Sequence, residues 1–185
     1  MLHRSKSSIK LPSYETLKQF EGKGNYAIKR YYQFPTNIFY KHKLKMVVKL
    51  MDKNRIYRNI LDFGSGPGIF TEELKRHALR VKQLEVGDAI DRRWKFDLVV
   101  AASVFEFCDV EKWSEIIHDW VSPNGQLIIA SPMDSWKTRL YFNLIKDTNS
   151  RLDEDKIFAG LINKFKLDDS LYWHGLYFAA RFIPK

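Results

Sequence analysis

The sequence contains very little cysteine, and this excludes several classes of protein. Among 185 residues only Cys108 is a cysteine, so the chain alone forms neither a disulfide framework nor a cysteine-rich zinc site. We therefore expect a reducing, cytoplasmic location. The longest largely apolar stretch, residues 98–105, is far too short to cross a bilayer. The first residues are basic and lack an apolar run, unlike a secretory signal.

Acidic residues are scarce in the first third of the chain. Residues 1–55 hold 13 lysines and arginines against three acids, whereas residues 56–185 hold 18 against 19. The net charge of +9 therefore belongs to the N-terminal part. This asymmetry indicates an acidic partner, namely phosphate, nucleic acid or an anionic membrane surface. A solvated face that only keeps the protein in solution is the alternative.

The N-terminal part has a helical pattern. Thr36 is a suitable N-cap for a helix that reaches about Asp52, and a shorter helix is expected after Ser13. Apolar residues of the longer helix recur with helical spacing, at Tyr40, Leu44, Val47, Val48 and Met51. Lysines repeat every four residues on a neighbouring face, at Lys41, Lys45, Lys49 and Lys53. Residues 1–54 are therefore expected to form a basic helical cap.

From residue 55 onward, strand and helix patterns alternate. Strands are expected over residues 56–63, 81–86, 96–103 and 126–131, with two more in residues 170–183. Helices are expected over residues 70–77, 110–120 and 153–165, and a turn over residues 122–125. The run over residues 96–103 is continuously apolar, as in a strand buried on both faces of a parallel sheet. The pattern predicts an α/β fold with a doubly wound, mostly parallel sheet.

The strongest functional motif is the glycine-rich segment between the first strand and the helix after it. It reads LDFGSGPG, with Asp62 before glycines at positions 64, 66 and 68. Glycine permits left-handed backbone and close approach of a ligand to the main chain. In open parallel sheets ligands bind beyond the carboxyl ends of the strands, where this turn lies. An ordinary strand–turn–helix corner is the alternative.

The spacing G-x-G-x-G differs from the G-x-G-x-x-G of dinucleotide-binding proteins, and Asp62 suits an amine better than a pyrophosphate. The segment resembles motif I of class I S-adenosylmethionine-dependent methyltransferases. The resemblance implies that Gly64, Ser65, Gly66 and Gly68 pass under the methionine part of the cofactor. It also implies that Asp62 helps to hold the cofactor's amino group, often through water.

Later segments extend this resemblance over about residues 56–133. Glu85 stands where the family places a carboxylate for the ribose hydroxyls, and VGDA with Asp88 and Ala89 resembles the segment that binds adenine. The run FDLVVAAS, ending at Ser103, followed by VFEF, resembles the family's fourth strand, and VSPNGQLIIA resembles its fifth. The resemblance implies a Rossmann-like core that binds S-adenosyl-L-methionine.

One departure from the family pattern concerns the sheet. The family has a helix and a strand between the ribose carboxylate and the adenine carboxylate, whereas Glu85 and Asp88 are three residues apart. About one βα unit is therefore missing. Either one strand serves both purposes, or only one assignment holds, in which case Asp88 is favoured. The deletion also keeps open a degenerate, non-catalytic member of the family.

The acceptor side is less well marked. Glu106, which follows the fourth strand, and His174, near a C-terminal loop, are the catalytic candidates, while His118 is expected to be structural. The residues after Val100 are Ala-Ala-Ser, so the motif of methyltransferases acting on base or amide nitrogens is absent. Cys108 is not preceded by proline, which argues against a cysteine nucleophile on cytosine.

The sequence therefore predicts a cap over residues 1–54 and a methyltransferase core over residues 55–185. The expected function is methyl transfer from S-adenosyl-L-methionine to a small-molecule or lipid-like acceptor. In one interpretation the acceptor is acidic or phosphorylated. No metal is expected. Two alternatives remain, a catalytically degenerate binding module and a nucleic-acid-directed methyltransferase that uses residues 1–55. In the lipid interpretation the cytoplasmic protein is peripheral at a membrane.

Overall fold

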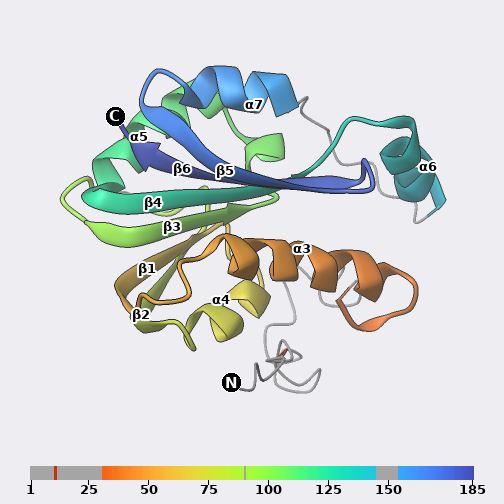
Figure 1. Cartoon of the computed structure of the whole chain (residues 1–185), viewed down its shortest axis with the longest axis horizontal. Coiled ribbons are helices and arrows are strands. Elements are labelled where there is room, and N and C mark those ends of the chain that lie inside the picture. Colours follow the sequence, from red (N-terminus) through yellow and green to blue (C-terminus); the bar gives the residue numbers. More distant parts are fainter. Residues whose placement is uncertain (1–10, 12–30, 90, 145–153) are drawn as a thin grey trace, which may run out of the picture.

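A single six-stranded sheet organises the chain in the computed structural model, which describes residues 11, 31–89, 91–144 and 154–185. The strand order is β2-β1-β3-β4-β6-β5 (Figure 1). The bounds are β1 Tyr57–Phe63, β2 Ala78–Leu84, β3 Phe96–Ala102, β4 Val121–Pro132, β5 Phe165–Trp173 and β6 Tyr177–Pro184. Strands β1 to β4 pair in parallel, while β6 is antiparallel to β4 and to β5. The predicted doubly wound, mostly parallel sheet is confirmed.

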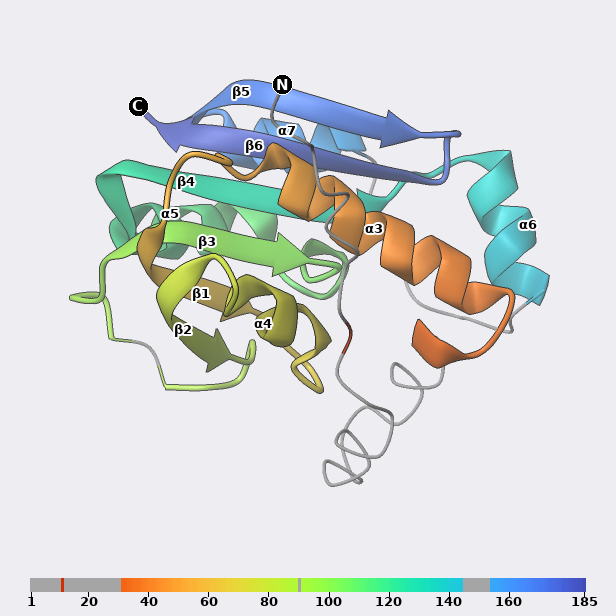
Figure 2. The same cartoon turned by 60° about the horizontal axis from the view of Figure 1, so that its bottom comes forward.

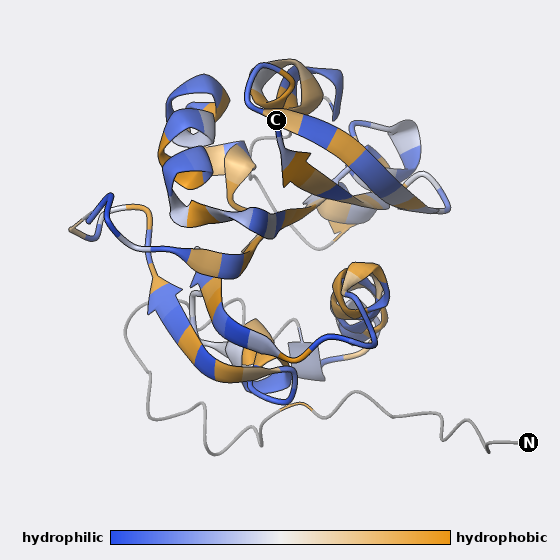
Figure 3. Cartoon of the chain, turned by 60° about the vertical axis from the view of Figure 1, so that its left-hand side comes forward, coloured by the Kyte–Doolittle hydropathy of each residue, from blue (hydrophilic) through white to orange (hydrophobic). Residues whose placement is uncertain are grey.

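Helices cover both faces of the sheet. Helices α3 (Thr36–Leu50) and α4 (Ile69–Leu74) lie on one face, and α5 (Val110–Trp120) and α7 (Glu154–Leu161) lie on the other (Figures 1 and 2). Helix α6 (Trp136–Leu144) lies at the end of the molecule to which β3 and β4 point. The edge strands carry polar residues between apolar ones, as the coloured bands in Figure 3 show, and only Leu84 of β2 and Phe165 of β5 are buried.

The apolar run of β3 explains its central place. Leu98 and Val100 belong to the core under α3 and α4, whereas Val99 and Ala101 belong to the core under α5 and α7. The polar residue of this run, Asp97, has a separate purpose. Its carboxylate accepts hydrogen bonds from the backbone N–H groups of Arg58 and Asn59, at 2.6 and 3.1 Å. The run therefore holds the middle of the sheet and fixes the start of β1.

Helix α3 is an integral layer of the fold. Its residues Tyr40, Leu44, Val47 and Leu50 are buried in the same cluster as sheet residues such as Ile128. The end of the helix is tied to the sheet, because the Leu50 carbonyl accepts a hydrogen bond from the Arg181 guanidinium at 2.6 Å. Residues 1–10 and 12–30 of the predicted cap, including the helix expected after Ser13, lie outside the described residues.

Several predicted element bounds were wrong in detail. Thr36 does not cap α3: its hydroxyl donates to the Gln33 carbonyl, and Pro35 precedes the helix. The turn expected over residues 122–125 lies within β4, where the register against β3 shifts beside Phe96. The helix expected over residues 153–165 ends at Leu161, and Phe165 begins β5 because its ring is needed in the core. Helix α6 was not predicted.

Chain connection within the sheet confirms the missing unit. Strand β2 lies at the edge, and the described residues between Leu84 and Phe96 contain no helix or strand. The chain leaves β1 on one side for β2 and then returns past β1 to β3 on its other side. The carboxyl ends of β1 and β3 therefore form the point of the sheet where ligands bind in open α/β folds.

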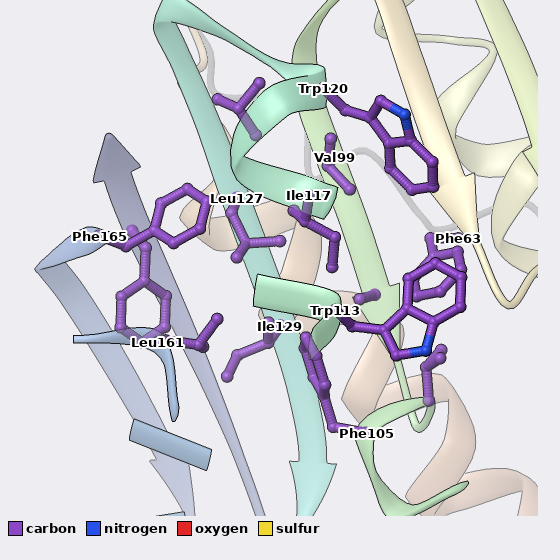
Figure 4. Close-up of a cluster of buried hydrophobic side chains, with 14 of the residues drawn as sticks. Phe63, Val99, Phe105, Trp113, Ile117, Trp120, Leu127, Ile129, Leu161 and Phe165 are labelled. Atoms are coloured by element: carbon purple, nitrogen blue, oxygen red, sulfur yellow. The ribbon is translucent and has the colours of Figure 1, made fainter. Parts of the chain in front are cut away.

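Trp120 anchors α5 to the sheet. Its side chain is fully buried beside Phe63, Trp94 and Trp113, and its indole N–H donates to the Asp91 carbonyl at 3.1 Å (Figure 4). Trp120→Ala should lower the free energy of unfolding by about 3–5 kcal/mol, because a large cavity replaces the ring. Trp120→Phe should cost about 1–2 kcal/mol, mainly for the lost hydrogen bond and the small loss of volume. Urea denaturation of both variants measures this, and equal losses would contradict the described packing.

Candidate functional site

The turn between β1 and α4 has an unusual backbone. Gly64, Gly66 and Gly68 have φ angles of +70°, +52° and +78°, all in the left-handed region. The Gly64 N–H donates to the Leu84 carbonyl at 2.7 Å, and the Gly68 N–H donates to the Ser65 carbonyl at 3.0 Å. Left-handed backbone at three alternate positions is strained for any side chain except glycine. The glycine spacing is therefore a requirement of this turn.

The three glycines differ in the space beside them. A Cβ atom on Gly64 would lie 2.3 Å from Val104 Cγ2, and one on Gly68 would lie 2.6 Å from Gln83 Nε2. A Cβ atom on Gly66 would meet no atom within 4 Å. At Gly64 both packing against Val104 and the backbone conformation require glycine, whereas at Gly68 the φ of +78° is the stronger requirement because the Gln83 side chain can move aside. The centre of the turn, Gly66, faces open space at the carboxyl edge of the sheet.

Glu85 lies directly across from this turn, at the end of β2. Its Oε1 accepts hydrogen bonds from Ser65 Oγ at 2.9 Å and from the Gly66 N–H at 2.6 Å. Asp88 Oδ2 accepts from the Glu85 N–H at 2.8 Å, and the Asp88 N–H donates to the Glu85 carbonyl. Both carboxylates therefore lie in the turn that follows β2, and the exposed Ala89 comes directly after that turn.

Asp62 lies beneath the glycine turn and is almost completely buried. Its Oδ2 accepts a hydrogen bond from Thr71 Oγ1 at 2.5 Å, so α4 holds the carboxylate. Burial raises the pKa of Asp62 to about 7, although the hydrogen bonds from Thr71 act in the opposite direction. The nearby charge of Glu85 raises this pKa further. A carboxyl group that titrates near neutral pH thus supports the turn from below.

Ser103 ends β3 beside the glycine turn, and it has a positive φ of 57°. Its N–H donates to the Ala130 carbonyl at 2.7 Å, which holds it against β4. Its hydroxyl accepts a hydrogen bond from Lys43 Nζ at 2.8 Å. Lys43 comes from α3, has only 3% of its side chain exposed, and points its ammonium group toward the rings of Tyr40, Phe70 and Tyr177, 5.0–5.9 Å away.

Lys43 is a site residue that the sequence pattern did not predict. The predicted basic face consists of the lysines at every fourth position, and Lys43 is not among them. A lysine in phase with the buried Tyr40, Leu44 and Val47 is the signal that could have found it, since lysine is rarely buried without a partner.

Glu106 lies in a short 3-10 helix, Phe105–Phe107, next to the end of β3. Its Oε1 accepts a hydrogen bond from Ser131 Oγ at 2.6 Å, and only 7% of the residue is exposed. Burial raises the pKa of Glu106, while the hydrogen bond from Ser131 and the charge of Lys43 lower it. The structure therefore brings Glu106 together with Lys43, near Ser103, in one buried polar group at the ends of β3 and β4.

His174 lies apart from this group. It is exposed in the hairpin between β5 and β6, with a φ of 51°, and its carbonyl accepts a hydrogen bond from Lys137 Nζ at 3.3 Å. His118 lies on α5, where its ring contacts that of Phe165, as expected of a structural residue. Cys108 packs against the core, and burial raises the pKa of its thiol to about 11.

A surface cavity of about 420 Å³ lies elsewhere on the sheet. Its lining comes from the early parts of β1 and β3 and the middle of β2, and includes Asn59, Arg80, Lys82 and Trp94. This cavity is far from the carboxyl ends of the strands, so it is separate from the glycine turn. Within the described ranges, no group of histidines, cysteines and acids could hold a metal ion.

Comparison with known proteins finds similarity at the level of structure. No protein-family model and no curated protein matches the sequence. N-methyltransferase NodS from Bradyrhizobium japonicum WM9, in complex with S-adenosyl-L-homocysteine, matches with a TM-score of 0.64 at 16% identity, over 92% of this chain and 97% of that one. The PH0226 protein from Pyrococcus horikoshii OT3 matches with a TM-score of 0.62 at 12% identity, over 86% and 98%.

A third match is the TehB-like SAM-dependent methyltransferase from Corynebacterium glutamicum, with a TM-score of 0.55 at 15% identity, over 77% of this chain and 87% of that one. The chain has the fold of class I methyltransferases. At identities of 12–16% these three neighbours establish the fold, whereas activity depends on the site residues of this chain.

The buried Asp62 makes a testable contribution to stability. Its pKa in the folded protein, about 7, exceeds the ordinary 3.8 of the unfolded chain, so the folded state binds a proton that the unfolded state releases. The contribution is complete below pH 4 and is lost as the pH rises toward 7. Asp62→Asn removes this dependence. Between pH 5 and pH 8 the wild-type protein should lose about 2–3 kcal/mol relative to the variant.

Urea denaturation at both pH values measures this difference. Glu111→Gln, on the exposed side of α5, is the control that should follow the wild type. Parallel pH profiles for the wild type and Asp62→Asn would show that Asp62 has no raised pKa.

Proposed function

We propose that the protein is an S-adenosylmethionine-dependent methyltransferase that acts on a small-molecule or lipid-like acceptor. The observation that carries the proposal is the glycine turn. The space beside Gly66 is open, and the Gly66 N–H donates a hydrogen bond to the Glu85 carboxylate. This turn stands at the end of β1, in a fold whose solved neighbour NodS was crystallised with S-adenosyl-L-homocysteine.

The residues around the turn fit the proposed cofactor. The space above Gly66 admits a ligand against the main chain, which no larger residue there would allow. Glu85 and Asp88 supply carboxylate oxygens on the β2 side, and both side chains are exposed to a ligand. Ser103 borders the site on the β3 side. When bound, S-adenosylmethionine supplies a methyl group already activated on a sulfonium.

The role of the protein is then to orient the acceptor and to exclude water. Tyr31, Tyr40 and Tyr177 lie buried on the α3 side of the ends of β3 and β4, where they keep water from Lys43 and Ser103. Glu106 is the group suited to hold or accept an acceptor proton, because burial raises its pKa and Ser131 fixes one oxygen. The exposed His174 is a less suitable base.

A catalytically degenerate binding module is the second candidate function. The observation that favours it is the shortened connection between β2 and β3, which leaves β2 at the sheet edge. Asp88 also uses one carboxylate oxygen to close the turn with Glu85, so it has less capacity for a nucleobase. Such a module would bind the cofactor without turnover.

Calorimetric titration with S-adenosylmethionine and S-adenosylhomocysteine tests the proposal. We expect micromolar binding of both ligands to the wild type. Gly66→Arg should weaken binding about tenfold or more, because the new side chain fills the open space above the turn. Ile56→Arg, at an exposed position just before β1, introduces the same side chain far from the site and should bind like the wild type.

Two outcomes would contradict the proposed site. If the folded wild-type protein binds neither ligand, S-adenosylmethionine is not its cofactor. If Gly66→Arg binds the ligands as well as the wild type does, the binding site is not at the glycine turn. Binding without methyl transfer to any of a broad set of small-molecule and lipid acceptors would favour the degenerate module.

A further inference from the structure

Helix α6 exposes an apolar stripe that the proposed function does not use. Trp136, Leu140 and Leu144 have 71%, 53% and 75% of their surfaces exposed, and they follow one another at every fourth position. Residues four apart lie on the same side of a helix. The opposite side of α6 is buried through Tyr141 and Phe142. The helix is therefore apolar on both sides, and one side meets no part of the described chain.

The start of α3 and the turn before it, which lie beside α6, also expose apolar side chains. Ile38, in the first turn of α3, is 50% exposed, and Phe34, before the helix, is 80% exposed. The rings of Phe39 and Tyr141 lie 3.8 Å apart and join α3 to α6. Figures 1 and 2 both show α6 beside the N-terminal end of α3. We call the five exposed residues, Phe34, Ile38, Trp136, Leu140 and Leu144, the apolar end. Large exposed apolar patches mark interaction sites.

Basic residues flank the apolar end. Lys41 and Lys45 follow Ile38 at helical spacing along the outer side of α3, and Lys45 is exposed. Helix α6 adds the exposed Lys137, and also Arg139, which pairs with Asp134 at 2.9 Å. Residues 31–51 contain no acid. Lys41, Lys45 and Lys137 therefore bring positive charge to this end of the molecule.

The combination favours one class of partner. Aliphatic side chains and a tryptophan flanked by lysines are the composition of a helix that lies in a membrane interface. Nucleic acid would use flat rings for stacking, whereas three of the five residues, Ile38, Leu140 and Leu144, are aliphatic. A second copy of this chain would bring its lysines against the same lysines. No helix in the described ranges is long and apolar enough to cross a membrane.

We propose that the apolar end docks on an anionic membrane surface, with Lys41 and Lys45 against the lipid headgroups. The docking surface lies at the same end of the molecule as the carboxyl ends of β3 and β4. A docked protein thus presents the region of Ser103 and Glu106 near the bilayer, where an apolar acceptor would reach it. Membrane binding itself requires no cofactor, so it is tested independently of the methyltransferase activity.

Co-sedimentation of the full chain with lipid vesicles tests the proposal. The protein should sediment with vesicles of phosphatidylcholine mixed with phosphatidylglycerol and should remain in the supernatant with phosphatidylcholine alone. Added salt should weaken the binding, because it screens the lysines. Lys41→Glu with Lys45→Glu should lower the partition coefficient at least about tenfold. Trp136→Ser with Leu140→Ser should lower it by a similar factor, through the lost apolar contact.

Matched controls use the same changes at exposed positions elsewhere. Leu79→Ser lies on β2, and Lys156→Glu with Lys166→Glu lies on α7 and β5. These variants should bind vesicles like the wild type or with a small loss from the changed net charge. Circular dichroism and S-adenosylhomocysteine titration confirm that the test variants keep their fold and site.

Several outcomes would overturn the membrane proposal. These are equal sedimentation with neutral vesicles, no sedimentation at all, and no effect of either test pair beyond that of its control. Binding of a labelled oligonucleotide without vesicle binding would assign the lysines to nucleic acid. Light scattering could show twice the mass of one chain for the wild type and the mass of one chain for Trp136→Ser with Leu140→Ser. That result would assign the apolar end to a contact with a second copy of the chain.

Discussion

The structure depends on the way the backbone leaves β1. Three left-handed residues at alternate positions turn the chain from the strand into α4, and a hydrogen bond from Gly64 to Leu84 holds the turn against β2. A side chain at Gly64 would collide with Val104, and all three glycines have the left-handed backbone that other residues avoid. These constraints place Gly66 at the sheet edge, and the buried Asp62 supports the turn from below.

The shortened core places two carboxylates at the same location. Because no strand of the described part of the chain lies beyond β2, Glu85 and Asp88 share the turn that follows it, and Glu85 reaches back to the Gly66 N–H. On the other side of the site, Lys43 reaches from α3 to Ser103 at the end of β3. These hydrogen bonds connect the glycine turn to β2 and α3 to the end of β3. A fold reduced by one unit therefore retains polar groups on both sides of the open centre of the turn.

Much of this arrangement could be predicted, because the fold has strong local signals. The apolar run of β3 and the helix after the capping residue Asp109 have the bounds that pattern predicts, within one residue. Local pattern failed where tertiary packing decides. Helix α6 is apolar on both sides, so its sequence has no clear amphipathic period. Residues 122–125 have the sequence of a turn but form part of β4. Lys43 was not predicted as a site residue because a helical apolar pattern predicts apolar residues at buried positions, and a lysine at such a position is an exception to it.

The most direct test of the account is a map of where S-adenosylhomocysteine binds, from backbone amide shifts of isotope-labelled protein during a titration. We predict that the largest shifts occur at Ser65, Gly66 and Gly68, at residues 85–89 and at Ser103, with small shifts along β5 and α7. Shifts centred instead on Arg80, Lys82 and Trp94, around the separate cavity, would contradict the assignment of the glycine turn as the cofactor site.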